Sequence, residues 1–239
     1  MSIHRFAAAK MLLRDMGKAG LAIMVLATAG PDSEDPGITS AGASTAWRRA
    51  NLGFVSAYIL YRKGEAVLID TGVAGSEVPI RTALGEVGLN WDSVSHVIVT
   101  HRHDDHQGSL EGVMQRTDDA PWYAGAGDMA AIHSKIAGTV VGDGDSVFDL
   151  EIIETPGHTP GHISVLDRAA KVLVSGDAIN GADGGVIGAN PEFTEDMTLA
   201  NVSIKKLAAF DFDVVLFGHG EPVESGADVA VRGLASSLS

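Results

Sequence analysis

The stretch VIVTHRHDDHQG, Val97–Gly108, decides both the fold class and the chemistry expected of this chain. Its first three residues, Val97 to Val99, form a β-branched run that is typical of a buried strand. Three histidines and two aspartates follow within six residues: His101, His103, Asp104, Asp105 and His106. Neutral imidazole nitrogens and carboxylates are the ligands that Zn²⁺ and neighbouring first-row metals take in proteins. The stretch therefore predicts a metal site at the end of a strand.

Three further residues of the same chemical kind lie beyond predicted strands later in the chain. His158 lies in TPGHTPGH, residues 155–162, and Asp177 and His219 each follow a glycine at a strand end. Glycine lets the backbone approach closely without a steric penalty. Side chains gathered from strand ends on one edge of a sheet form a rigid pocket, so we expect these residues to converge. His162 offers a second imidazole in the same stretch as His158.

Composition limits the classes of function. The chain has 239 residues, enough for one large or two small domains, and 17 basic against 31 acidic residues give a net charge of −14. This charge argues against binding nucleic acid or anionic lipid. There is no cysteine, which excludes disulfides and thiolate ligands. Any metal must therefore be held by nitrogen and oxygen atoms.

The first fifty residues differ from the rest of the chain. In residues 1–29, basic residues precede the apolar run Ala19–Leu26 and an Ala-Thr-Ala end, so we interpret this segment as either a secretory signal or an N-terminal helix. The run is too short to span a bilayer. The protein is accordingly expected to be either cytoplasmic or exported. Residues 30–50 are rich in Gly, Pro, Ser and Asp and are predicted to be a linker or surface loop, which leaves residues 51–239 as the folded domain.

Strands and helices are both predicted within that domain, which indicates an α+β protein. The predicted strands include Val55–Tyr61, Ala66–Asp70, Val147–Thr155, Lys171–Ser175 and Val214–Phe217. The predicted helices include Glu77–Val87, Asp128–Lys135 and Thr198–Ala209. Residues 178–197 are rich in glycine and lack periodicity, so we expect a loop there.

Taken together, these residues resemble the metallo-β-lactamase superfamily. His101, His103, Asp105 and His106 match its H-x-H-x-D-H signature, with Asp104 in a variable position. His158, Asp177 and His219 match the later ligands, and Asp70 matches an early aspartate at a strand end. The resemblance covers roughly residues 52–222, with a core like those of glyoxalase II enzymes and lactonases. It implies an α+β fold, the four-layer αββα sandwich.

The resemblance also implies a ligand set for two metal ions, expected to be Zn²⁺, with iron or manganese as alternatives. By this correspondence His101, His103 and His158 hold one ion. Asp105, His106 and His219 hold the second, and Asp177 bridges both. His162 falls in a supporting position, because the family pattern takes the first histidine of the stretch as the ligand.

Such a site predicts a dinuclear metal-dependent hydrolase acting on a small molecule. A hydroxide bridging two ions at neutral pH attacks a carbonyl carbon, and the ester, lactone, thioester or amide bond opens. The leaving group then binds the other ion, or takes a proton from Asp105 or from a bound water. The oligomeric state is left open.

Two other functions are compatible with the same fold. One is a sulfur dioxygenase that uses a single iron held by two histidines and one aspartate. The other is a metal-binding module without catalytic activity. The presence of all seven ligands favours the dinuclear hydrolase over both.

Overall fold

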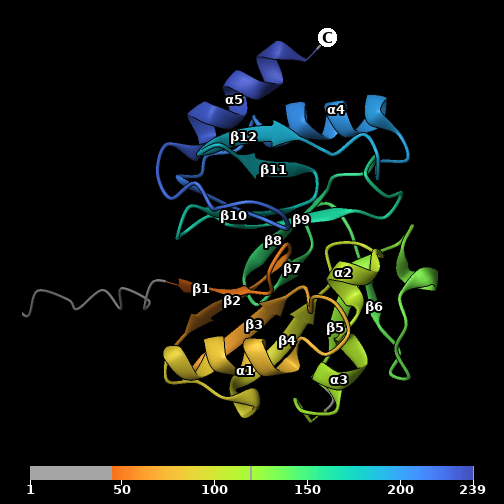
Figure 1. Ribbon diagram of the computed structural model, residues 1–239, viewed down its shortest axis with the longest axis vertical. Coiled ribbons are helices and arrows are strands. Elements are labelled where there is room, and N and C mark those ends of the chain that lie inside the picture. The colour runs from red at the N-terminus through yellow and green to blue at the C-terminus, as the bar shows by residue number, and fades with distance from the viewer. Residues whose placement is uncertain (1–44, 119, 239) are drawn as a thin grey trace, which may run out of the picture. The chain divides into compact units, whose positions relative to one another are not determined.

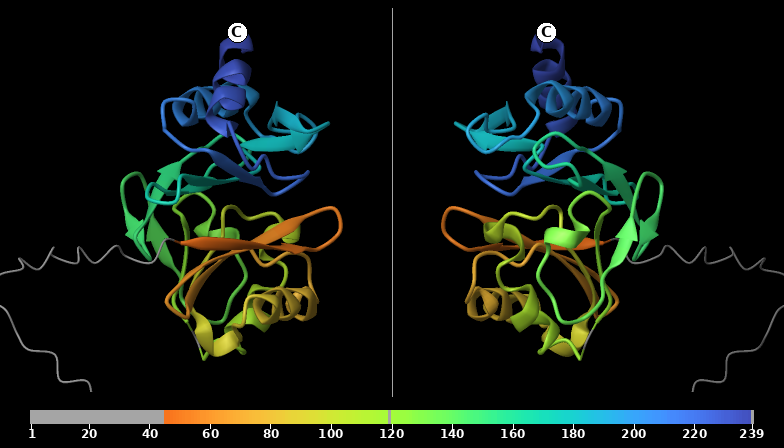
Figure 2. Two further views of the ribbon diagram at one scale, coloured as in Figure 1. Left: turned by 90° about the vertical axis from the view of Figure 1, so that its left-hand side faces the viewer. Right: turned by 90° about the vertical axis from the view of Figure 1, so that its right-hand side faces the viewer.

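Two β-sheets lie face to face, and helices cover the outer side of each sheet in the computed structural model (Figure 1, Figure 2). The structure describes residues 45–118 and 120–238. The interpretation of residues 1–29 and most of the predicted loop at 30–50 therefore lie outside the described residues. Helices α1 and α3 cover one sheet, and α4 and α5 cover the other (Figure 1). The predicted α+β class and the four-layer αββα sandwich are confirmed.

The first sheet has six strands in the order β1-β2-β3-β4-β5-β6. Strands β1 to β3 pair antiparallel, and β3 to β6 pair parallel. The bounds of these strands are β1 Ala46–Asn51, β2 Ser56–Arg62, β3 Glu65–Ile69, β4 Val94–Ile98, β5 Trp122–Gly125 and β6 Thr139–Val141.

The second sheet has five strands in the order β13-β10-β9-β8-β7, and a separate hairpin is formed by β11 and β12. The bounds of these strands are β7 Ser146–Val147, β8 Leu150–Glu154, β9 Ile163–Asp167, β10 Val172–Gly176, β11 Ile179–Ala182, β12 Gly185–Gly188 and β13 Val214–Phe217. The α-helices are α1 Glu77–Glu86, α2 Asp104–Gln107, α3 Leu110–Met114, α4 Met197–Leu207 and α5 Ala227–Ser237. Two short 3₁₀ helices cover Trp91–Ser93 and Met129–Ala131.

The central strands are apolar on both faces because both faces are covered. In β2, Ala57 and Ile59 pack toward the helices, whereas Tyr58 and Leu60 pack toward the other sheet. Successive side chains of a strand point to opposite faces, so a strand between two layers loses the usual apolar–polar alternation. This explains why the strand signals in the sequence are continuous apolar runs.

Parallel and antiparallel pairing brings several carboxyl ends to one edge of the sandwich. Strands β8 and β10 both run antiparallel to β9, and β13 runs parallel to β10, so the three end on the same side. In the first sheet β3 and β4 are parallel and also end together. The predicted ligands follow β4, β8, β10 and β13, so topology alone assembles them.

Strand β1 corrects the expectation for residues 30–50, because Ala46–Asn51 is a strand instead of the end of a loop. It is an edge strand of its sheet, with two adjacent arginines and few inward apolar side chains. Trp47 packs against Tyr58 with 6.4 Å between ring centroids. An edge strand with polar side chains carries only a weak periodic signal.

The glycine-rich segment 178–197 also departs from the prediction, since its first half is the hairpin of β11 and β12. Asp183 and Gly184 form the turn with φ of 50° and 76°. Asp-Gly with positive φ at both positions is a strong signal for a tight two-residue hairpin turn. The glycines of the strands obscured it.

Two other elements are shorter than predicted. The helix expected over Asp128–Lys135 is only the 3₁₀ turn Met129–Ala131. The single strand expected over Val147–Thr155 is divided into β7 and β8 by Phe148 and Asp149, whose φ angles are 55° and 56°. No helix in the described part of the chain is both long and apolar enough to cross a membrane.

Tyr58 links the two sheets by a buried hydrogen bond. Its hydroxyl donates to the Phe217 carbonyl oxygen at 2.8 Å. Burial is the main reason that its pKa rises to about 12, so it remains a neutral donor. Tyr58→Phe leaves that carbonyl without its donor and should lower the free energy of unfolding by about 1–2 kcal/mol, measured by denaturant titration.

The matched control is Tyr61→Phe, because the Tyr61 hydroxyl has no hydrogen bond to the residues that the structure describes. We expect a change below about 0.5 kcal/mol for this variant. Equal losses for the two variants would show that the hydroxyl of Tyr58 is not what stabilises the contact between the sheets.

Candidate metal centre

The structure brings all seven predicted ligands together at the shared edge of the two sheets. Their nitrogen and oxygen atoms form overlapping groups in which all members lie within 4.8 Å of one another. The groups are His101, His103 and His158; His101, His106 and Asp177; and Asp105, His106 and His219. Four of the seven side chains are buried, and the other three are partly buried beside the pocket described below.

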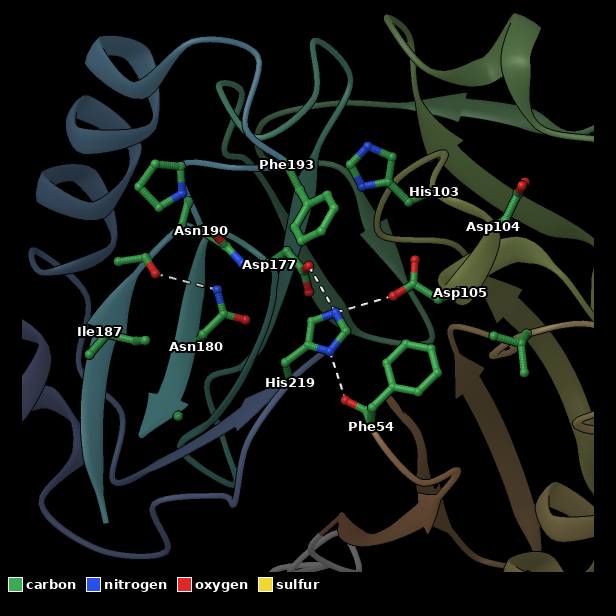
Figure 3. A pocket seen from close by; sticks show the side chains of 15 residues that line it. Phe54, His103, Asp104, Asp105, Asp177, Asn180, Ile187, Asn190, Phe193 and His219 are labelled. Atoms are coloured by element: carbon green, nitrogen blue, oxygen red, sulfur yellow. Dashed lines mark hydrogen bonds and ion pairs between the residues drawn. The ribbon is translucent and has the colours of Figure 1, made fainter. Parts of the chain in front are cut away.

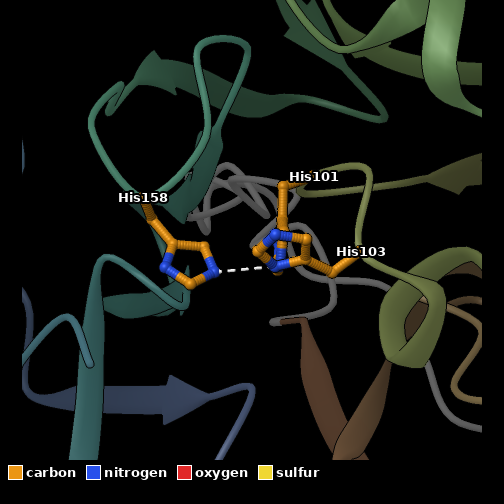
Figure 4. Close-up of side chains that lie close together, drawn as sticks. All are labelled: His101, His103 and His158. Atoms are coloured by element: carbon orange, nitrogen blue, oxygen red, sulfur yellow. Dashed lines mark hydrogen bonds between the residues drawn. The ribbon is translucent and has the colours of Figure 1, made fainter. Parts of the chain in front are cut away.

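Three imidazoles form the first group (Figure 4). The Nδ1 atom of His103 lies 3.1 Å from Nε2 of His101 and 3.0 Å from Nε2 of His158. His101 and His158 are buried, so these nitrogens are held in fixed positions. Three ring nitrogens this close match the donor set of a zinc ion with an open fourth position.

The carboxylate of Asp177 lies between the first group and the remaining ligands. Its Oδ2 atom is 3.5 Å from Nε2 of His158 and 3.2 Å from Nε2 of His219, and its Oδ1 atom is 3.3 Å from Nε2 of His106. Gly218 makes this position accessible, because a Cβ there would lie 2.1 Å from Oδ1 of Asp177. Asp177 is therefore placed to contact an ion in either group.

Asp105 completes the second group from the first turn of α2. Its Oδ2 atom lies 3.2 Å from Nε2 of His219 and 3.8 Å from Nε2 of His106. The short helix places Asp105 and His106 side by side at its start, while His219 reaches in from the end of β13. The second ligand group is thus formed by residues from two elements that are distant in sequence, helix α2 and the end of strand β13.

A buried carboxylate fixes the tautomer of His106. Asp70 lies at the end of β3 and its Oδ2 atom is 2.8 Å from Nδ1 of His106. A carboxylate accepts hydrogen bonds, so Nδ1 carries a proton and Nε2 is the nitrogen that faces the site. Asp70 is itself held by the amide and hydroxyl of Thr100, at 2.7 and 2.8 Å.

Hydroxyl groups fix the tautomers of two other histidines in the same way. Thr100 donates its hydroxyl proton to Asp70, so its oxygen accepts from Nδ1 of His101 at 3.1 Å. Thr194 donates its proton to the Asn190 carbonyl and accepts from Nδ1 of His158 at 3.0 Å. Both Nε2 atoms are thereby left as lone-pair donors that face the site.

His219 follows the same rule with a backbone partner. Its Nδ1 atom lies 2.7 Å from the carbonyl oxygen of Phe54, which can only accept. Four histidines held by four different partners therefore present Nε2 to one space. Outer hydrogen bonds of this kind orient metal-binding histidines and raise their basicity.

His162 does not take part in the site as a ligand, because both of its ring nitrogens are used inside the protein. Its Nε2 atom accepts from the Asp177 amide at 3.0 Å, and its Nδ1 atom lies 2.8 Å from the hydroxyl of Thr155. The backbone amide can only donate, so Nδ1 carries the proton. His162 holds the loop that presents Asp177.

The histidine pKa values are shifted in opposite directions in the first and second ligand groups. Burial lowers the pKa of His158 to about 4, despite the opposing charge of Asp177, and burial also holds the pKa of His101 well below its usual value. At neutral pH these imidazoles are neutral and can donate lone pairs. The first group is ready to bind a cation without first losing a proton from these rings.

The second group behaves oppositely. Burial by itself would lower the pKa of His106 and His219, but the carboxylates of Asp177, Asp70 and Asp105 outweigh it. The pKa rises to about 9 for His106 and to about 10 for His219. A metal ion bound here takes the place of those protons and satisfies the same carboxylates.

Two buried atoms of the site, Nε2 of His106 and Oδ1 of Asp177, lie 3.3 Å apart but form no hydrogen bond to each other or to another described residue. Buried polar atoms are almost always paired, and leaving one unpaired is costly. Both atoms point into the space between the groups. The donor set, the tautomers and these unpaired atoms all fit metal ions.

A pocket of about 1050 Å³ opens onto this centre (Figure 3). Asp105, Asp177 and His219 form its polar floor, and the rings of Phe54 and Phe193 lie on its sides (Figure 3). A concave site of this size with a few convergent polar groups is typical of small-molecule binding.

Supporting residues that the sequence did not indicate hold the histidine loop in place. Asp128 is buried and accepts from the Arg102 amide at 3.1 Å and from the Gly161 amide at 3.0 Å. It therefore ties the loop after β4 to the loop that carries His158. Its partners are 26 and 33 residues distant, so no local pattern signals this role. Thr194 and the Phe54 carbonyl also bond histidines that are distant in sequence, so no local pattern signals their roles either.

An αββα sandwich with a buried histidine–aspartate centre at its edge defines a known class of proteins. The chain belongs to the Metallo-beta-lactamase superfamily, whose family model matches residues 50–219. The predicted family resemblance is confirmed.

Individual relatives agree with this membership. The probable metallo-hydrolase YqgX of Bacillus subtilis is 30% identical over 200 residues, which cover 73% of this chain and 90% of that protein. A hydroxyacylglutathione hydrolase of Bdellovibrio bacteriovorus is 34% identical over 121 residues, or 49% of this chain and 45% of that protein. The chain thus matches less than half the length of the latter.

Solved structures share the fold at lower identity. A metallo-beta-lactamase family protein from Thermus thermophilus superimposes with a TM-score of 0.62 at 20% identity, covering 76% of this chain and 73% of that one. A superfamily protein from Sulfolobus tokodaii gives a TM-score of 0.60 at 24% identity, covering 78% and 81%.

Asp70 offers a test of how the centre is organised. Asp70→Asn keeps the shape of the side chain but removes the charge that fixes His106, so the variant should fold and bind Zn²⁺ about 10–100-fold more weakly. Competition with a chromophoric chelator measures the affinity. Asp104→Asn is the matched control, because the Asp104 side chain makes no hydrogen bond within the described residues and should leave the affinity unchanged. Unchanged affinity in Asp70→Asn would contradict this role.

Proposed function

We propose that this protein is a dinuclear metal-dependent hydrolase that opens a carboxylic ester, lactone, thioester or amide bond in a small molecule. The observation that carries the proposal is the position of the Asp177 carboxylate, within 3.5 Å of His158 from the first group and of His106 and His219 from the second. A carboxylate between two sets of nitrogen donors is the arrangement that a pair of ions requires.

The proposed ligands divide between two ions, with Zn²⁺ favoured and iron or manganese as alternatives. His101, His103 and His158 would hold one ion; Asp105, His106 and His219 would hold the other; Asp177 would bridge them. When bound, the pair supplies Lewis acidity at a carbonyl oxygen and a hydroxide nucleophile at neutral pH.

The protein's own groups orient this chemistry. Four imidazoles donate Nδ1–H hydrogen bonds to oxygens of Asp70, Thr100, Thr194 and the Phe54 carbonyl. These bonds hold each ring in one tautomer, so no proton has to move within them during turnover. The apolar sides of the pocket exclude water around the reacting carbonyl, which strengthens electrostatic interactions there.

Asp105 is the proposed catalytic carboxylate. Burial alone would raise its pKa, but the hydrogen bond from His219 and the charge of His106 lower it. Asp105 is therefore ionised at neutral pH and can accept the proton of a water molecule. It then holds a proton that the leaving group can take, which balances the proton transfer of hydrolysis.

The comparisons support hydrolysis without naming the bond. YqgX is described as a probable metallo-hydrolase, and several matched proteins are hydroxyacylglutathione hydrolases. The two solved structures described above are below 25% identity, so they support the fold alone. The substrate has to be inferred from the pocket.

Metal analysis with a substrate panel tests the proposal. Protein loaded with zinc and freed of excess metal should hold about two ions per chain and hydrolyse at least one member of a panel of esters, lactones, thioesters and amides. Asp177→Ala removes the shared ligand, so it should lose at least one ion and about 100-fold or more in turnover.

Asp92→Ala serves as the control, because Asp92 is exposed in the 3₁₀ helix before β4 and remote from the pocket lining. It should keep both metal and turnover. One tightly held iron, with oxygen consumption on a persulfide, would overturn the hydrolase in favour of the dioxygenase alternative. Bound metal without turnover on any substrate would favour the binding module.

A further inference from the structure

Three large apolar side chains are exposed around the pocket. Phe54 in the loop between β1 and β2, Ile187 in β12 and Phe193 in the loop before α4 are 65%, 49% and 59% exposed. Exposed apolar groups that gather at one concave site mark a surface that binds an apolar partner. They come from both halves of the sandwich, so the pocket has apolar side chains on both sides.

The two phenylalanines are positioned by the metal centre itself. The Phe54 ring stacks on His219 with 6.0 Å between centroids and an interplanar angle of 11°. Phe193 precedes Thr194, which hydrogen-bonds Nδ1 of His158. The apolar walls therefore begin directly beside the proposed ligands, where the rest of a substrate lies once its carbonyl reaches the ions.

The charged groups that line the pocket are all acidic or imidazole. No lysine or arginine belongs to the lining formed by the described residues. Asp105 and Asp177 face the histidines (Figure 3), whereas Asp104 is an exposed member of the pocket lining. Asp104 leaves a negative charge at the rim of the pocket.

The two arginines that contact loops of the centre are bound to protein carboxylates. Arg102 pairs with Asp128 and Glu195, and Arg49 pairs with Glu221 at 2.6 Å and also bonds the hydroxyl of Ser56. Neither is among the residues that line the pocket. A substrate carboxylate beside the phenylalanines would meet no lysine or arginine of the described pocket lining.

We infer that the pocket selects an uncharged ester or lactone with an apolar acyl group, and discriminates against substrates that carry a carboxylate distant from the scissile carbonyl. A distal carboxylate would be desolvated against Phe54 and Phe193 without a counter-charge, and Asp104 would repel it. The inference rests on the proposed function and specifies its substrate class.

A matched pair of esters tests the charge selection with the zinc-loaded enzyme. 4-Nitrophenyl hexanoate and the 4-nitrophenyl monoester of adipic acid have the same leaving group and acyl length, and differ by a terminal methyl or carboxylate. We expect kcat/KM to favour the hexanoate by about tenfold or more. Equal values, or a preference for the adipate ester, would overturn the inference.

Reversing the charge of Asp104 tests whether this residue causes the preference for the neutral ester. Asp104→Lys should reduce the preference for the neutral ester by about tenfold, because it exchanges a repulsive charge for an attractive one. Asp92→Lys makes the same change of net charge in the first turn of a short helix away from the pocket, and should leave the preference as in the wild type. The same shift in both variants would attribute the selection to overall charge and contradict the inference.

Binding of hexanophenone separates this inference from the proposed function, because the ketone has no bond to hydrolyse. Ligand-observed NMR on the zinc-loaded protein should show about tenfold weaker binding in Phe54→Ala and in Phe193→Ala. Val78→Ala, at a side chain 62% exposed on α1, is the control and should leave binding unchanged. If no member of the ester, lactone, thioester and amide panel is hydrolysed, the proposed function fails. If thioesters or amides are hydrolysed but neither ester is, or if hexanophenone binds equally well in the wild type and in both phenylalanine variants, the inference itself is overturned.

Discussion

Ring nitrogens of five histidines and two carboxylates face one another in a largely buried space, and holding them together is the constraint on which the rest of the molecule depends. Nitrogens that face one another at 3.0–3.1 Å repel unless a cation or proton lies between them. The protein holds them there by fixing the opposite nitrogen of four rings with hydroxyl, carboxylate or carbonyl oxygens. The fold thus preorganises the ligands for a cation before any ion binds.

The sandwich supplies the rigidity that this arrangement requires. Strands β8, β10 and β13 end on one edge, and β3 and β4 end beside them, so each ligand lies in a loop or short helix that follows a packed strand. Asp128 ties the loop after β4 to the loop after β8 through buried hydrogen bonds. Two residues of the pocket walls are linked to the proposed ligands: Phe54 stacks on His219, and Phe193 is next to Thr194, which bonds His158. The shape of the pocket therefore depends on the geometry of the metal centre.

Much of this was predictable from the sequence, because the ligand types lie at short spacings directly after apolar runs. The predicted strands alone place His101 to His106, Asp177 and His219 at one edge of the sheets, because each of these residues follows a strand. The residues that fix the tautomers could not, since the Phe54 carbonyl is 165 positions from His219 and Thr194 is 36 from His158. Strand β1 gives a weak sequence signal, because an edge strand with two arginines has little apolar periodicity. The β11–β12 hairpin, in contrast, could have been predicted from the Asp183-Gly184 turn, whose residues favour a tight hairpin.

The central claim is that these side chains hold two metal ions that share Asp177. Anomalous diffraction at the zinc edge from crystals of the metal-loaded protein tests it most directly. The account predicts two peaks per chain, one about 2.0–2.1 Å from nitrogens of His101, His103 and His158 and the other at similar distances from His106 and His219. Both should contact the Asp177 carboxylate. A single peak, or peaks that leave Asp177 uncoordinated, would contradict the account.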